Sequence, residues 1–135
     1  MDLSTINLNC RMDLSETLYN WITEISDNSV IPVEITAINF GIFETRTGYS
    51  LHCTGSIAYD PNDDDWATQI DFDPTPSLKY FALSKELIGN KKWNDIFNEV
   101  EQALKLIFSQ NSANLLFNKI IITTGFDDGE LLRVR

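Results

Sequence analysis

Residues 33–59, VEITAINFGIFETRTGYSLHCTGSIAY, decide the fold class of this chain. Along this stretch the side-chain pattern has a period of two residues, which is the period of a β-strand. Arg46-Thr47-Gly48 separates the two halves and predicts a hairpin turn. Both faces of the first half are partly apolar, so we expect a strand inside a sheet, or one that bends at Gly41.

Two amphipathic helices lie on either side of this hairpin in the sequence. Residues 12–26 place apolar side chains on one helical stripe, and Asp13 or Ser15 can accept from the free N–H groups of the first turn. Residues 93–110 continue such a stripe through about five turns. The apolar positions of this second stripe are Trp93, Ile96, Phe97, Val100, Ala103, Leu104, Ile107 and Phe108.

Further strands are expected at residues 78–83, 119–124 and 130–135, with a shorter one at 66–71. Strands segregated from two helices indicate an α+β fold with a mainly antiparallel sheet and both helices on one face. With 135 residues and a hydrophobic content of 43%, we expect one such domain over residues 1–135.

The composition excludes several classes of partner and compartment. The net charge of -10 argues against nucleic acid and anionic membranes, because both attract cationic surfaces. No stretch approaches the roughly 18 apolar residues of a membrane span, and the acidic start is unlike a secretory signal. We therefore expect a cytoplasmic protein. Cys10 and Cys53 lack metal-ligand spacing and are interpreted as buried small hydrophobic residues, with a disulfide or a reactive thiol as alternatives.

The negative charge is concentrated in the first part of the chain. Residues 1–78 hold 13 acidic and 2 basic residues, whereas residues 79–135 hold 7 acidic and 8 basic ones. Six of the acids fall within residues 60–73, and residues 47–78 contain no lysine or arginine. Like charges in a cluster repel one another unless a cation or a basic partner relieves them. This stretch is therefore a solubilising loop, a surface for a basic protein, or a metal site.

Trp66 lies inside the acidic stretch and has two interpretations. It packs back to pin the loop, or it projects as an anchor for a partner, as tryptophans ringed by polar groups often do. A second acidic turn at Asp127-Asp128 can add to the same surface. The candidate partner-binding residues are Asp60, Asp63, Asp64, Asp65, Trp66, Asp71, Asp127 and Asp128.

The metal interpretation rests on a partial calcium-loop register. Positions 1, 3, 5, 7, 9 and 12 of that register would be Asp60, Asn62, Asp64, Trp66, Thr68 and Asp71. Asp65 stands where the sharp turn of such a loop requires glycine, and Asp71 is shorter than the usual bidentate glutamate. We therefore predict no metal and no cofactor, and keep a calcium-stabilised module as an alternative.

No motif in the sequence predicts catalysis. P-loop, GxSxG and HExxH patterns are absent, and the single histidine, His52, lies beside Cys53 in a strand pattern. Adjacent strand residues point to opposite faces, so these two side chains are not expected to form a nucleophilic pair. We predict no catalytic residue and a structural role for His52.

Two short motifs resemble those of small acidic immunity-type proteins encoded beside bacterial polymorphic toxins. They are Tyr59-Asp60-Pro61-Asn62-Asp63-Asp64-Asp65-Trp66-Ala67 and Thr124-Gly125-Phe126-Asp127-Asp128-Gly129-Glu130-Leu131. The resemblance implies a non-enzymatic protein that binds and neutralises a cognate toxin domain, often by covering its active site. A nuclease toxin would present a basic groove, which agrees with an acidic inhibitor.

A second function class remains open, namely a non-catalytic adaptor domain that self-associates, for example as a homodimer. Its candidate edges are the apolar strand Ile38–Phe43 and the last hairpin. Light scattering separates the two classes, because a stable, salt-insensitive homo-oligomer favours the adaptor.

Overall fold

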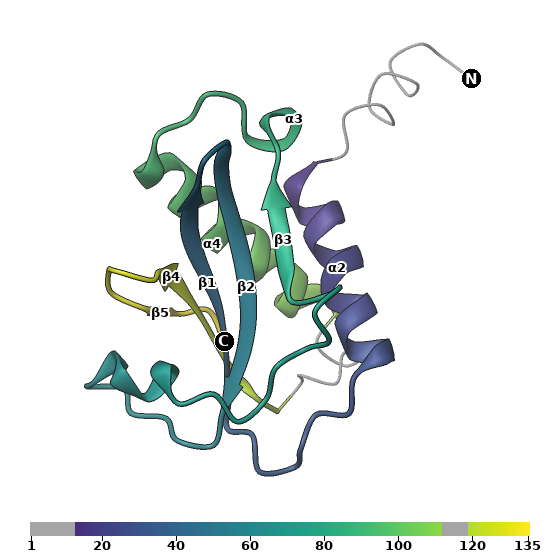
Figure 1. The fold of residues 1–135 in the computed structure, drawn as a ribbon, viewed down its shortest axis with the longest axis vertical. Coiled ribbons are helices and arrows are strands. Elements are labelled where there is room, and N and C mark those ends of the chain that lie inside the picture. Colours follow the sequence, from purple (N-terminus) through teal and green to yellow (C-terminus); the bar gives the residue numbers. More distant parts are fainter. Residues whose placement is uncertain (1–12, 112–118) are drawn as a thin grey trace.

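The computed structural model describes residues 13–111 and 119–135, and these form an α+β fold (Figure 1). Its helices are α2 (Leu14–Asn28), the short α3 (Lys85–Ile88), the long α4 (Trp93–Asn111) and the 3-10 helix η1 (Asp64–Thr68). Its strands are β1 (Ala37–Thr45), β2 (Gly48–Ser56), β3 (Tyr80–Leu83), β4 (Ile121–Phe126) and β5 (Leu132–Arg133). Cys10 and the start of the first predicted helix lie outside the described residues.

The described strands form one sheet in the order β3-β2-β1-β4-β5. All neighbours are antiparallel except β1 and β4, which are parallel. The predicted hairpin is confirmed, with Phe40 opposite Cys53 and Gly41 opposite His52. Between β3 and β4 the chain runs through α3 and α4, so that β4 can return alongside β1 in the same direction.

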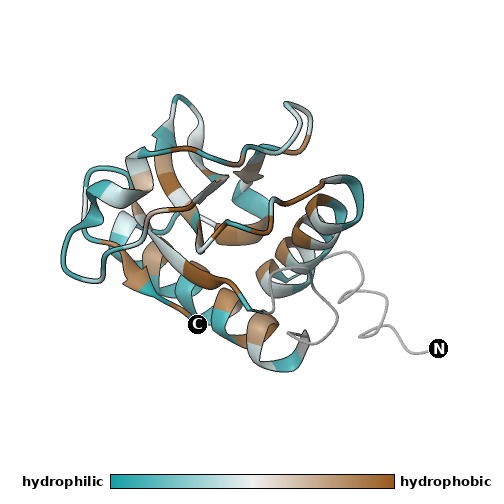
Figure 2. Cartoon of the chain, turned by 90° about the horizontal axis from the view of Figure 1, so that it is seen from below, coloured by the Kyte–Doolittle hydropathy of each residue, from teal (hydrophilic) through white to brown (hydrophobic). Residues whose placement is uncertain are grey.

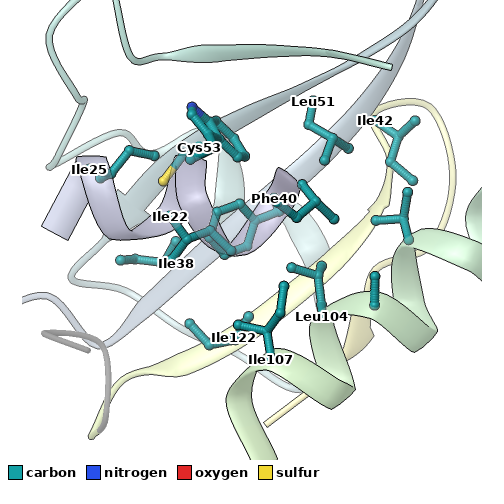
Figure 3. Packing of buried hydrophobic residues seen from close by; sticks show 14 of the residues in the cluster. Ile22, Ile25, Ile38, Phe40, Ile42, Leu51, Cys53, Leu104, Ile107 and Ile122 are labelled. Atoms are coloured by element: carbon teal, nitrogen blue, oxygen red, sulfur yellow. The ribbon is translucent and has the colours of Figure 1, made fainter. Parts of the chain in front are cut away.

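Both long helices contribute to one hydrophobic core on the same face of the sheet. Phe40 lies between Ile22 of α2 and Leu104 and Ile107 of α4 (Figure 3). The described strands of the sheet contribute six fully buried side chains to this core, namely Ile38, Phe40, Ile42, Leu51, Cys53 and Ile122. Coloured by hydropathy, the strands and helices carry the hydrophobic segments, while the loops at the left of the view are mainly hydrophilic (Figure 2).

Local chemistry explains where α2 begins and how it attaches to the sheet. The Asp13 side chain accepts a hydrogen bond from the Glu16 amide at 2.8 Å, which confirms it as the N-cap. Seven residues into the helix, the buried Trp21 indole N–H donates to the Leu78 carbonyl at 2.7 Å, just before β3. This hydrogen bond joins α2 to the β3 edge of the sheet, where the Trp21 ring stacks on Phe81.

The structure corrects several expected strands. The first strand begins at Ala37 rather than Val33 and runs without a break through Gly41. The strand expected at 66–71 is wrong, because η1 occupies much of it and only Phe72, just beyond, makes an isolated bridge to Gly55. The last strand is only two residues long.

The edge proposed for self-association at Ile38–Phe43 is also wrong. This segment belongs to β1, which is paired with β2 on one side and β4 on the other, so its backbone groups are already used. The sheet edges are β3 and β5, both short. Across the described ranges, no helix combines the length and apolar character needed to cross a membrane.

Candidate partner-binding surface

Four of the six carboxylates in the acidic loop, residues 60–73, accept hydrogen bonds from backbone amides of the loop or of neighbouring described segments. The Asp60 side chain accepts from the Asn62 amide at 2.9 Å, and that of Asp63 caps η1 by accepting from the Asp65 amide at 3.0 Å. Asp71 accepts from the Ile57 amide at 2.8 Å. These bonds fix the loop against the end of β2, so its charges are held in place rather than spread over a mobile segment.

Trp66 pins this loop. Only 7% of the residue is exposed, its ring meets Tyr59 edge-on at 5.1 Å between centroids, and its carbonyl accepts from the Ser56 hydroxyl. Of the two interpretations of Trp66, the structure therefore favours pinning. Among the candidate partner-binding residues Trp66 contributes by positioning the acidic loop, since a partner cannot reach its ring in this conformation.

The calcium register does not converge on one point. Asp60, Asp64 and Asp71 each accept from a different backbone amide, of Asn62, Leu131 and Ile57 respectively. Among the residues that the structure describes, no group of three or more histidine, cysteine, aspartate or glutamate side chains lies close enough to hold a metal ion.

The acidic turn, residues 127–130, lies beside the acidic loop although the two are far apart in sequence. The Asp64 carboxylate accepts from the Leu131 amide at 3.0 Å, which ties η1 to the segment between β4 and β5 (Figure 1). Asp60, Asp63, Asp64 and Asp65 of the loop and Asp127 and Asp128 of the turn are all exposed. The structure thus joins the two acidic segments that the sequence singled out.

His52 and Asp127 form a pair that the sequence did not predict. The His52 Nε2 lies 2.8 Å from the Asp127 Oδ1, with the histidine side chain 18% exposed. The absence of a side chain at Gly41, directly opposite on β1, makes room for this pair, because a Cβ there would collide with both partners. The His52 Nδ1 is buried without a partner among the described residues. The pair anchors the acidic turn to β2.

Cys53 points into the core, away from His52, as the strand alternation predicts. Burial raises the pKa of its thiol, and the nearby negative charge of Asp73 raises that pKa further. The folded protein therefore keeps a thiol proton that the unfolded chain releases, so this group makes stability fall as the pH rises above the thiol's ordinary pKa.

We expect Cys53 to be unreactive in the folded protein. In a Cys10→Ser variant, a thiol-specific chromogenic reagent at neutral pH should react fully only after denaturant is added, because the nucleophile is the thiolate. Complete reaction within the mixing time in the absence of denaturant would contradict the burial of Cys53.

A groove with aromatic walls opens beside the acidic turn. It encloses about 820 Å³ between the β1–β2 hairpin, the start of α4 and the β4–β5 connection. We call it the aromatic groove and define it by Tyr49, Trp93, Phe97 and Phe126, with an acidic rim of Glu44, Asp127, Asp128 and Glu130. Phe126 is central, with ring centroids 5.9 Å from Tyr49 and 6.0 Å from Trp93, both edge-on.

Trp93 was expected in the core from the helical stripe of residues 93–110, and this expectation is wrong. The period of α4 assigns it to the buried face, yet it is 62% exposed, while Ile96, Val100 and Leu104 on the same stripe are buried. The reason is its position as the first residue of α4, where it contacts Phe126 and lines the groove instead of the core. Two lysines immediately before it, Lys91 and Lys92, were the available signal that this end of the stripe faces solvent.

A second, shallower hollow of about 540 Å³ adjoins the aromatic groove on the other face of the sheet. Phe43 and Asp127 line both, and Ile70 and Tyr80 contribute exposed apolar surface to the second. Aromatic and apolar surface therefore continues from the groove toward the end of the acidic loop, where Lys79 also lines the second hollow.

Searches against models of known protein families, curated proteins and solved structures found no match to this chain.

Proposed function

We propose that this protein is an immunity protein that binds and neutralises a cognate bacterial toxin domain through its acidic surface. The observation that carries the proposal is the hydrogen bond from the Leu131 amide to Asp64, which holds the acidic loop and the acidic turn together. A surface assembled from two separate segments presents one field of negative charge to a partner. Such a field suits a basic target, and the cationic active-site groove of a nuclease is one example.

Most carboxylates of the acidic loop have no cationic partner in the described ranges, so their negative charge is available to attract a basic protein. Among described residues, the acidic loop has one salt bridge, from Lys79 to Asp73 at 2.9 Å, at its far end. Asp60, Asp63, Asp64 and Asp65 have no lysine or arginine partner within the described part of the chain. Unpaired exposed carboxylates raise the association rate with a cationic surface, and salt screens that effect.

We expect a variant with four neutralised carboxylates to associate with the toxin domain about tenfold more slowly, and its association rate to depend less on salt. The four residues are Asp60, Asp63, Asp64 and Asp65. Asparagine is the substitution of choice, because its side-chain oxygen still accepts the hydrogen bonds that build the loop. Stopped-flow or surface-based kinetics at several salt concentrations measure both quantities.

The matched control changes the same amount of charge elsewhere. This control variant neutralises four exposed carboxylates outside the acidic loop and the acidic turn, by Glu24→Gln, Asp27→Asn, Glu34→Gln and Glu86→Gln. We expect this variant to keep most of the wild-type association rate. If both quadruple variants slow association equally, only net charge matters and the loop is not part of the interface. If neither variant changes the rate or its salt slope, the acidic loop has no part in steering.

A further inference from the structure

We propose that the aromatic groove receives an arginine side chain presented by a basic segment of the partner protein. This inference rests on the proposed function for the identity of the partner, and it names the position on the surface where that partner is anchored. An exposed aromatic ring on the groove wall and carboxylates on its rim, without cationic partners in the described part of the chain, both match the guanidinium group.

The aromatic walls supply the first half of the recognition. Trp93 lines the groove, is 62% exposed, and contacts the Phe126 ring edge-on. The Phe126 ring in turn contacts Tyr49. A mostly exposed ring in contact with Phe126 offers surface on which a planar cation can stack.

The rim supplies the second half. Glu44, Asp128 and Glu130 are exposed, and within the described ranges none of them forms a salt bridge. Nor does any lysine or arginine among the described residues line the groove. Guanidinium stacks on aromatic faces and also donates to carboxylates in a fork geometry, whereas an ammonium group lacks the planar stacking surface. Arginine therefore fits this combination better than lysine.

Charge also decides between the possible occupants. A second copy of this chain carries a net charge of -10 and presents the same acidic rim, so two grooves facing each other would repel. Nucleic acid would bring phosphates against the same carboxylates. A basic segment of another protein is the occupant that relieves the rim charge.

The test is a titration of the full-length, uniformly ¹⁵N-labelled protein with a short arginine–glycine peptide, followed by NMR at the tryptophan indole and backbone amide signals. The three tryptophans act as internal reporters, because Trp21 and Trp66 are buried and Trp93 is exposed. We expect the Trp93 indole signal to shift saturably, the other two to stay, and a matched lysine–glycine peptide to bind several-fold more weakly. A peptide with citrulline in place of arginine should give no shift, because it has no charge.

Two variants locate the binding. The first variant is Trp93→Ala, whose binding is followed through the backbone amide signals. The second is the triple variant Glu44→Gln, Asp128→Asn and Glu130→Gln. Each should lower the affinity for the arginine peptide by roughly tenfold. The matched control of equal charge change, Glu24→Gln, Asp27→Asn and Glu34→Gln, should keep wild-type affinity. Circular dichroism checks the fold, and the triple variant carries the test if Trp93→Ala fails to fold.

Each outcome bears on the groove separately from the immunity role. A shift at Trp66 instead of Trp93, equal binding of the citrulline peptide, or full affinity in both groove variants overturns the arginine inference. A toxin domain that wild type and both groove variants capture with equal strength also overturns it, while the proposed function stands. Arginine-specific binding at Trp93 in a protein that captures no toxin domain leaves the groove in place and removes the immunity role.

Discussion

Replacing Phe40 with alanine is expected to lower the free energy of unfolding by about 4 kcal/mol. The side chain is fully buried in β1, between the two long helices. Its ring meets Trp21 of α2 edge-on at 5.7 Å and lies 6.3 Å from the Phe108 ring of α4. Truncation therefore removes contacts to both helices at once and leaves a cavity between them and the sheet. Chemical denaturation followed by circular dichroism measures the loss.

The control for this prediction is Phe43→Ala on the same strand. Phe43 points to the other face of the sheet and is only half-buried, beside His52 and Tyr80. Because less apolar area is removed from water there in the native state, we expect less than half of the loss seen at Phe40. Equal losses at the two positions would mean that the core does not lie on the helix-covered face.

Gly125→Ala should lower the free energy of unfolding by about 2–3 kcal/mol and also loosen the acidic surface. Gly125 is buried in β4, and a Cβ there would collide with the backbone carbonyl oxygen of Glu130. Backbone atoms cannot rotate away as a side-chain tip can, so the segment of Glu130 and Leu131 must shift. That segment donates to Asp64, so the link between the acidic loop and the acidic turn should weaken as well.

Two measurements separate these effects. Denaturation gives the change in stability, and amide hydrogen exchange at Leu131 reports the bond to Asp64. Gly129→Ala is the matched control, because its added Cβ would meet only ordinary contacts at 3.7 Å to Phe126, and we expect a change below about 0.5 kcal/mol. Wild-type stability and unchanged Leu131 exchange in Gly125→Ala would contradict the close approach of the two segments.

The local part of the fold was predictable because its signals lie within short windows. The stripe from Leu14 to Ile25 and the Asp13 cap predicted α2, and the alternation around Arg46-Thr47-Gly48 predicted the β1–β2 hairpin. The parallel pairing of β1 with β4 was not predictable from such patterns. It joins residues such as Asn39 and Thr123, which are 84 positions apart, and depends on how α4 packs.

The candidate surface was predictable in composition and not in arrangement. The acidic loop and turn are visible as clusters in the sequence, but the bond from Leu131 to Asp64 spans 67 positions and the His52–Asp127 pair spans 75. Helical periodicity also assigned Trp93 to the core, because a stripe does not tell where the surface that covers it ends. The aromatic groove arises from tertiary contacts among the β1–β2 hairpin, the start of α4 and the β4–β5 connection.

We expect the acidic surface to bind a basic toxin domain. Capture from a lysate of the source cell with the intact protein, at about 50 mM and about 500 mM salt, tests this claim when it is followed by mass spectrometry and an assay of the captured protein. We predict a single basic protein whose toxic activity is inhibited by this chain and whose retention falls at high salt. Recovery of this chain alone, unchanged by salt, would contradict the claim and favour the self-associating adaptor.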